Sequence, residues 1–254
     1  MRRPTVAHLT PPMSFEAMID AMPTADAKLC VYNYGGPEAA VADIASYFDV
    51  DSNDVSRKRT ADKPDGTAVV AVDGDPLLEA RVTALRRAVR TTAEVLRNVD
   101  PAEPLPSDLL ASLSGGTFAS HDRRRLLVAS RHIERRVHRV GAGALHASFQ
   151  RLSRLANDLP TLAYYNLLAR AGVDVYVYGV PDERLENADE LTVVGVDSGE
   201  IASTWMVAFD GDGDDDEKAA LLAREEASND WRGFWTFDPA AVDGVIEYTT
   251  ATYG

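Results

Sequence analysis

Apolar positions recur along the chain in two spacings, one typical of helices and the other of strands. Helical spacing is found in residues 15–21, 37–48, 76–99, 121–140, 157–171, 217–228 and 239–253. Apolar runs and period-two alternation predict strands at residues 28–34, 55–59, 67–72, 117–120, 145–155, 173–180 and 233–237, and a hairpin of 191–196 with 201–210. Because strands and helices are interleaved, we expect an α/β fold with a mixed β-sheet and flanking helices.

The proline-rich stretch Asp100–Pro106 is the best candidate for an internal boundary. It divides the chain into an N-terminal β-α-β-β-α lobe, residues 14–100, and a C-terminal α/β lobe, residues 101–254. Residues 1–13 are expected to form a flexible tail. The boundary stretch is too short to separate independent domains, so we expect two lobes of one unit.

The composition indicates an acidic protein adapted to concentrated salt. Forty Asp and Glu residues oppose 26 Lys and Arg residues, of which only four are lysine, and the net charge is −14. Salt screens the self-repulsion of such a surface, which favours an origin in a halophilic archaeon. No apolar run reaches the roughly 18 residues that span a membrane, and the N-terminus lacks the apolar core of a secretory signal, so we expect a cytoplasmic protein.

One segment inverts this charge. Residues 120–154 carry nine arginines against Asp122 and Glu134, a net charge of +7, together with four of the five histidines. A cationic patch in an acidic protein binds either an external anion or the acidic parts of its own chain.

On a helix over residues 121–140, the basic residues fall into two groups. Arg124, Arg131 and Arg135 lie opposite the apolar stripe and form a candidate interaction face for an acidic partner. Three residues on the boundary of the stripe form a candidate clamp for a carboxylate or phosphate, with His146 on the following strand as a weaker fourth member: Arg125, His132 and Arg136.

A second interpretation of the same residues stays open. The arginines can pair with carboxylates of the chain itself, and Glu134 with His138 has the i,i+4 spacing of such a pair. His146 alternates with strand residues, a position also typical of a core histidine.

Motifs for metal binding and catalysis are incomplete or missing. The sequence His132-Ile-Glu134 resembles the H-x-E of a zinc deaminase, but with Cys30 as the single cysteine the required C-x-x-C is absent. Residues 210–216 begin like a calcium loop, yet Asp215 stands where glycine is needed and Leu221 where the closing glutamate belongs. There is no nucleophile elbow, Walker motif or kinase signature. We therefore expect no metal site and no enzyme; the cofactor is unknown, and the net charge of −14 opposes nucleic-acid binding.

Three motifs carry a resemblance to a known family. They are LHASFQRL at residues 145–152, GVDVYVYG at residues 172–179 and GFWTFDP at residues 233–239. The chain resembles the DICT sensory domain, named for its occurrence in diguanylate cyclases and two-component systems. The order of elements before residue 100 is similar to that of stand-alone members from salt-loving archaea, so the resemblance extends over roughly residues 14–253.

The resemblance implies a signal-input domain without known catalytic residues, and it assigns no ligand to any residue. Aromatic residues interleave with polar ones in and near these motifs, as expected either for a pocket lining or interface or for the core of the C-terminal lobe: Tyr176, Tyr178, Trp205, Trp231, Phe234, Trp235 and Phe237.

Our first hypothesis is a cytoplasmic sensory module that binds a small ligand or anion and signals through a separate partner or by self-association. The alternatives are an interaction subunit that docks an acidic partner on its arginine-rich helix, and an enzyme of unrecognised type.

Overall fold

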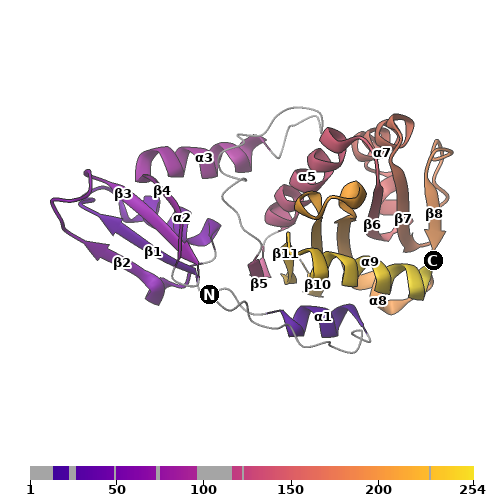
Figure 1. The fold of residues 1–254 in the computed structure, drawn as a ribbon. Coiled ribbons are helices and arrows are strands. Elements are labelled where there is room, and N and C mark those ends of the chain that lie inside the picture. The colour runs from indigo at the N-terminus through magenta and orange to yellow at the C-terminus, as the bar shows by residue number, and fades with distance from the viewer. Residues whose placement is uncertain are drawn as a thin grey trace.

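The computed structural model describes residues 14–22, 27–48, 50–72, 75–95, 116–121, 123–228 and 230–254. The predicted tail at residues 1–13 and the predicted boundary at residues 100–106 lie outside the described residues. Within them the chain forms two β-sheets with flanking helices, which confirms the α/β class with mixed strand directions (Figure 1).

The first sheet has four strands in the order β2-β1-β3-β4. Its elements are β1 (Ala27–Tyr32), α2 (Glu38–Tyr47), the 3₁₀ turn η1 (Ser52–Asp54), β2 (Val55–Lys58), β3 (Thr67–Val72), β4 (Asp75–Arg81) and α3 (Val82–Val95). Strand β1 runs parallel to β2 and antiparallel to β3. Leu29, Val70, Ile44 and Leu85 are among the residues that bury the helices against this sheet.

The prediction of one helix over residues 76–99 was wrong for residues 76–81. Residues 75–81 form β4, which pairs antiparallel with β3 so that Leu78 lies opposite Val70 and Ala80 opposite Ala68. The helix α3 begins only at Val82. Pairing with a preceding strand overrides the helical spacing of Leu77 and Leu78 because a strand gains ladder hydrogen bonds that local spacing does not reveal.

The second sheet has seven strands in the order β5-β11-β10-β9-β6-β7-β8. They are β5 (Gly116–His121), β6 (Ala144–Arg151), β7 (Asp174–Val180), β8 (Thr192–Gly195), β9 (Thr204–Phe209), β10 (Ala219–Ala227) and β11 (Asp230–Thr236). Strands β6, β7 and β8 are parallel, whereas β9, β10, β11 and β5 each run antiparallel to the strand beside them.

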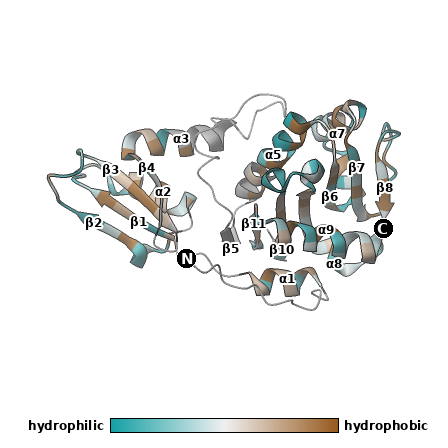
Figure 2. Ribbon diagram, viewed as in Figure 1, coloured by the Kyte–Doolittle hydropathy of each residue, from teal (hydrophilic) through white to brown (hydrophobic). Residues whose placement is uncertain are grey.

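Helices cover both faces of this sheet. Those on the first face are α5 (Arg123–Val140), α6 (Leu152–Ala156) and α7 (Leu159–Ala171). Those on the second face are α1 (Phe15–Ala21), α8 (Gly199–Ser203) and α9 (Pro239–Tyr253). The 3₁₀ turns η2 (Gly211–Gly213) and η3 (Asp215–Glu217) connect β9 to β10. Figure 2 shows hydrophobic residues along the central strands and hydrophilic ones on the outer turns of α5.

Helix α1 forms where residues 15–21 predicted a helix, but its packing differs from the prediction. We placed it in the N-terminal lobe, whereas its buried residues Phe15, Met18 and Ile19 join the core of the second sheet. Its apolar face is covered there by residues of β9, β10 and α9 that lie more than 180 positions along the chain, a contact that local spacing cannot predict.

Two predictions in the second sheet were wrong. The helix predicted over residues 217–228 is replaced by strand β10, Ala219–Ala227. Its run AALLA is buried on both faces of the sheet, so the sequence lacks the alternation by which a strand is recognised. Residues 191–196 and 201–210 do not form a hairpin. Strand β8 pairs with β7, strand β9 lies between β10 and β6, and Ser198 caps the intervening helix α8.

Candidate functional site

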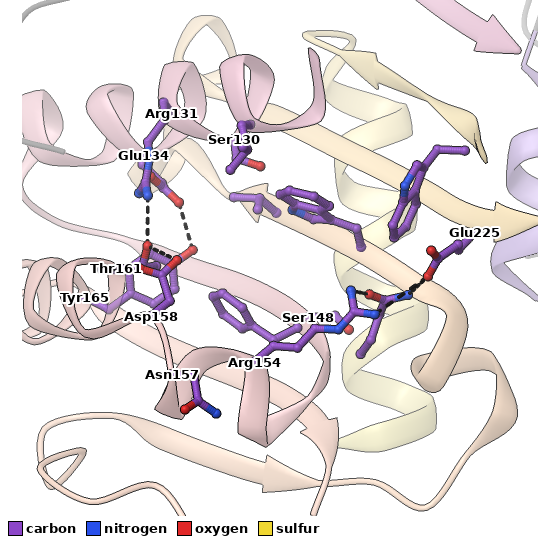
Figure 3. A pocket seen from close by; sticks show the side chains of 16 residues that line it. Ser130, Arg131, Glu134, Ser148, Arg154, Asn157, Asp158, Thr161, Tyr165 and Glu225 are labelled. Carbon is purple, nitrogen blue, oxygen red and sulfur yellow. Dashed lines mark hydrogen bonds and ion pairs between the residues drawn. The ribbon is translucent and has the colours of Figure 1, made fainter. Parts of the chain in front are cut away.

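A cavity of about 610 Å³ opens between helix α5 and the α6–α7 pair, over the C-terminal end of β6 (Figure 3). Its lining comes from helices α5, α6 and α7 with their caps and from strands β6, β9, β10 and β11: Leu127, Ser130, Arg131, Glu134, Ser148, Phe149, Gln150, Arg154, Asn157, Asp158, Thr161, Tyr165, Trp205, Val207, Glu225 and Trp231. Its size is that of pockets that enclose small organic ligands. The carboxyl end of a parallel strand is also where open α/β sheets usually bind their ligands.

Aromatic rings form one wall of the cavity. Phe149 on β6 lies directly across from Trp205 on β9 in the strand register. Behind them, Tyr165 contacts Phe149 edge-on with ring centroids 5.7 Å apart, and Trp231 contacts Trp205 in the same manner at 5.7 Å. Tyr165 and Trp231 are buried, whereas Phe149 and Trp205 keep part of their rings exposed toward the cavity.

A buried ion pair lies at the α5–α7 end of the cavity. The Arg131 Nη1 atom donates to Glu134 Oε2 at 2.6 Å, and Arg131 Nη2 donates to Thr161 Oγ1 at 2.8 Å. Thr161 Oγ1 in turn donates to Asp158 at 2.8 Å, and the Tyr165 hydroxyl donates to Glu134 Oε1 at 3.0 Å. The side chain of Glu134 is only 3% exposed. These contacts form one continuous network that ties α5 to α7.

Burial dominates the titration of this network. It raises the pKa of Glu134, and Arg131 opposes that effect by its charge and its hydrogen bond. Burial also raises the pKa of Tyr165 well above its usual value, reinforced by the charge of Glu134. The hydroxyl of Tyr165 therefore keeps its proton and serves Glu134 as a hydrogen-bond donor.

Polar residues of β6, α6 and β10 form the opposite end of the cavity. Gln150 Nε2 donates to Glu225 Oε2 at 2.9 Å, and the guanidinium of Arg154 lies 3.7 Å from the same carboxylate. Arg154 also donates to the side-chain oxygen of Gln150. Gln150 has a left-handed backbone, with φ of 62°, where the β6 ladder becomes irregular. Gln150 is buried where this irregularity turns the backbone, and it lines the cavity there.

Two polar groups of the lining are buried without a hydrogen-bond partner among the described residues. They are the Oγ atom of Ser130 and the Nε1 atom of Trp231, in side chains of residues that are 3% and 1% exposed. A buried polar group without a partner costs about 1–3 kcal/mol. Such a cost is typical of a site that a ligand completes.

The predicted clamp does not lie in this cavity. His132 and Arg136 lie on the other edge of α5, where the His132 ring contacts Phe237 edge-on at 5.7 Å and the Arg136 guanidinium lies 4.9 Å from the centre of the same ring. Arg136 also donates to the backbone oxygen of Asp216 at 2.5 Å. Burial, helped by the charges of Arg136, Arg135 and Arg139, lowers the pKa of His132 to about 4. The side chain of Arg125 is outside the described residues.

His146 lies on the opposite face of the sheet from the cavity. Its ring stacks on Tyr176 with centroids 4.6 Å apart, and its Nδ1 atom is 3.0 Å from the Tyr178 hydroxyl. Burial lowers its pKa to about 4. These contacts are those of a core histidine, the alternative that the strand pattern had left open.

In the predicted interaction face, the arginines whose side chains the structure describes contact residues of the chain itself. Arg131 is held by Glu134 and Thr161, so its side chain is only 17% exposed. The predicted pair of Glu134 with His138 is replaced by this one because Glu134 points toward α7, while His138 stays exposed 6.1 Å from the Tyr164 ring. Arg135 is half-buried beside Tyr164 and Glu134, and the side chain of Arg124 is outside the described residues.

Sequence reasoning missed most of the lining. It singled out Trp205 and Trp231 as members of an aromatic set, and both line the cavity, whereas Tyr178 and Phe234 belong to the core of the opposite face. Glu134 was detectable as the one carboxylate inside an arginine-rich helix. Its partners Thr161 and Tyr165 carried no signal because they come from a helix almost 30 residues away.

The segment that forms most of this cavity matches a family of sensory domains. Residues 107–226 match the DICT family model, described as a sensory domain in diguanylate cyclases and two-component systems. The DICT-matched segment contains every lining residue except Trp231. It is shorter than the resemblance we predicted over residues 14–253, and the motif at 233–239 lies beyond it. The match supports a sensory, signal-input role.

Other comparisons add little to the DICT match. No curated protein matches the chain. A crystal structure of polyphosphate kinase from Porphyromonas gingivalis is similar with 11% identity and a TM-score of 0.35, over 95% of this chain and 48% of that one. The chain thus spans about half the length of that kinase, and a likeness this low supports no conclusion on fold or function.

Within the described residues, no three His, Cys, Asp or Glu side chains converge in a geometry that could hold a metal ion. Among the same residues, no helix has the length and apolar character required to cross a membrane.

Proposed function

We propose that this chain is a cytoplasmic signal-input module that binds a small molecule in the cavity between α5 and α7. One observation carries the proposal: a half-open cavity, formed almost wholly by the DICT-matched segment, is lined by aromatic rings and by two residues whose buried polar groups have no partner among the described residues. A core that served stability alone would gain by filling this space with apolar side chains.

We further propose that binding changes contacts with a separate signalling protein or with a second copy of the chain. Helices α5 and α7 form the two sides of the cavity, and Arg131, Glu134 and Thr161 couple them. A ligand bound between the two helices weakens or strengthens the contacts of Arg131 with Glu134 and Thr161. Either change alters the outer surface of both helices.

The alternative of an acidic partner docked on the arginines of α5 has less support. Arg131 is committed to Glu134, and Arg139 donates to both carboxylate oxygens of Glu217 at 2.9 and 2.5 Å. A partner would have to displace these internal carboxylates. The role we propose is binding without catalysis.

The test is mass spectrometry of small molecules that co-purify with the full chain. Ser130→Leu, which adds bulk at the cavity and removes the hydroxyl, should purify without the compound found in the wild type. Ala163→Leu, on the exposed side of α7, is the matched control and should retain it. The proposal would be refuted if Ser130→Leu co-purified with the same compound as the wild type. It would also be refuted if the wild type carried no compound and no member of a metabolite library shifted its melting temperature.

A further inference from the structure

We infer, on the basis of the proposed function, that the cavity takes an uncharged, planar nitrogen heterocycle with a ring carbonyl, of the purine or pteridine type. Three independent properties of the lining lead to this class of ligand: its ring surfaces, its charge and its unmet hydrogen-bonding groups.

The ring surfaces favour a planar aromatic ligand. Phe149 and Trp205 stand side by side on neighbouring strands, and the rings of Tyr165 and Trp231 support them edge-on from behind. These contacts fix the orientations of Phe149 and Trp205, which line the cavity and remain partly exposed. Aromatic groups pack best on the faces of such rings in offset stacks, and an aliphatic ligand gains less from them.

The charges of the lining disfavour an anion. Two arginines and three carboxylates line the cavity. Both arginines already face a carboxylate, Arg131 at 2.6 Å from Glu134 and Arg154 at 3.7 Å from Glu225. A phosphate or dicarboxylate would have to break these pairs and would leave Glu134 buried without its counter-charge, which is costly. An anionic ligand, which the basic segment had predicted, therefore does not fit this cavity.

The unmet groups indicate which polar atoms the ligand needs, and because both are fully covered in this structure, neighbouring side chains must shift slightly for a ligand to reach them. The indole Nε1 of Trp231 can only donate, so it requires an acceptor such as a ring carbonyl or an unprotonated ring nitrogen. The Ser130 hydroxyl can donate or accept, and Asp158 and Glu225 offer further acceptors to ring N–H or amino groups. A lactam ring carries a carbonyl acceptor and an N–H donor on adjacent atoms, and two fused rings fit within about 610 Å³.

The decisive experiment is titration calorimetry of the full chain with four probes. Hypoxanthine and lumazine are neutral fused heterocycles with ring carbonyls, inosine 5′-monophosphate adds a ribose 5′-phosphate to the first of them, and succinate is an aliphatic dianion. The expected result is binding of one or both neutral heterocycles at least about tenfold tighter than the nucleotide, equivalent to one net hydrogen bond or more, and no heat from succinate.

Variants locate the binding. Trp205→Ala should weaken the heterocycle more than about tenfold, Trp205→Phe should restore most of the affinity, and Ser130→Ala should weaken it about tenfold. His138→Ala, on the exposed side of α5, is the control and should bind as the wild type does. Circular dichroism melting curves identify any variant that fails to fold, and if Trp205→Ala does so, Ser130→Ala tests the site without removing a ring.

Several results would overturn the inference. Tighter binding of succinate or of the nucleotide would refute the ligand class while leaving the proposed function in place. Heterocycle affinity that is unchanged in both Trp205→Ala and Ser130→Ala would refute the site. No binding by any of the four probes would refute the class, and the co-purification experiment would then decide separately whether the cavity binds another compound.

Discussion

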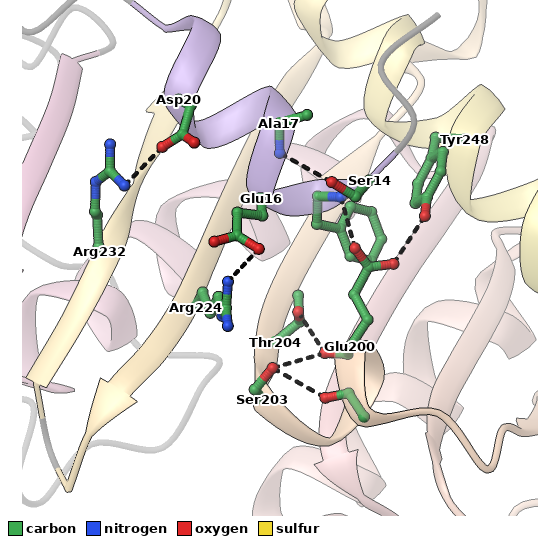
Figure 4. A network of polar contacts seen from close by, with 12 residues as sticks. Ser14, Glu16, Ala17, Asp20, Glu200, Ser203, Thr204, Arg224, Arg232 and Tyr248 are labelled. Carbon is green, nitrogen blue, oxygen red and sulfur yellow. Dashed lines mark hydrogen bonds and ion pairs between the residues drawn. The ribbon is translucent and has the colours of Figure 1, made fainter.

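The two faces of the seven-stranded sheet differ in whether their buried polar groups have hydrogen-bond partners among the described residues. On the face of α1, α8 and α9, the carboxylate of Glu200 accepts from the Phe15 backbone N–H and the Tyr248 hydroxyl, each at 2.8 Å, and from the Tyr253 hydroxyl (Figure 4). On the face of α5 and α7, Ser130 and Trp231 have buried polar atoms that find no partner within the part of the chain that the structure describes. The first arrangement is complete without a ligand, and the second is not.

Strands β10 and β11 show the contrast within one pair of strands. The register places Arg224 opposite Arg232, and these side chains bind Glu16 and Asp20 of α1 at 2.6 Å each. One position along, Glu225 lies opposite Trp231, and both line the cavity. Alternate residues of a strand face opposite sides, so the same two strands fasten α1 on one face and present groups to a ligand on the other.

The largest effect is expected from breaking the ion pair beside the cavity. Glu134→Ala leaves the guanidinium of Arg131 and the hydroxyl of Tyr165 without their acceptor in a buried place, and should lower the free energy of unfolding by about 3 kcal/mol. Glu134→Gln keeps the shape and should cost less. Urea denaturation measures both. A loss below about 1 kcal/mol for Glu134→Ala would show that the pair is not a support of this face.

A smaller effect on stability is expected on the face of the sheet that α1, α8 and α9 cover. Glu200→Ala removes the shared acceptor of α1 and α9 and should cost about 2 kcal/mol, with faster hydrogen exchange in residues 15–21. Heterocycle binding should stay within about twofold of the wild type, since the described contacts of the Glu200 carboxylate are with α1 and α9 and not with the cavity lining. If Glu200→Ala abolished binding, the separation of the two faces would be wrong.

His146 should make stability depend on acidity. Its pKa is about 4 in the fold, below the usual 6.5, so the unfolded chain takes up a proton first as the pH falls. The stability that the neutral ring provides is complete above pH 6.5 and declines as the pH falls toward 4, by about 1 kcal/mol between pH 7.5 and 5.5.

His146→Phe keeps the stack on Tyr176 and removes the titration. The unfolding free energy of the wild type minus that of the variant, measured by urea denaturation across that pH range, should therefore fall by about 1 kcal/mol toward acid. A difference that is constant with pH would contradict the lowered pKa. His132, whose pKa is also about 4, contributes equally to both proteins and cancels.

The smallest effect is expected where the sequence had placed the ligand. Arg136→Ala removes the contacts with Phe237 and Asp216 on the far edge of α5 and should change heterocycle affinity by less than about twofold. A tenfold loss would return the site to the predicted clamp of Arg125, His132 and Arg136.

Local pattern predicted the elements whose neighbours do not alter them. The apolar stripe of α5 is buried as expected at Leu126, Ile133 and Val137, and α9 begins with Pro239 after the capping residue Asp238. Strands β4 and β10 were missed because pairing with β3 and burial on both faces decide them. The cavity was missed for the same reason. The sequence pattern placed Arg131 on the exposed side of its helix, whereas contact with Thr161 of α7 buries most of its side chain.

The most direct test of the ligand site is the indole N–H signal of Trp231 in a ¹H–¹⁵N NMR spectrum of the full chain, assigned with Trp231→Phe. Titration with hypoxanthine or lumazine should shift this signal, because Nε1 gains the acceptor that the protein does not supply, while the Phe15 amide, already bound to Glu200, should stay unchanged. A probe that binds without moving the Trp231 signal would contradict the account.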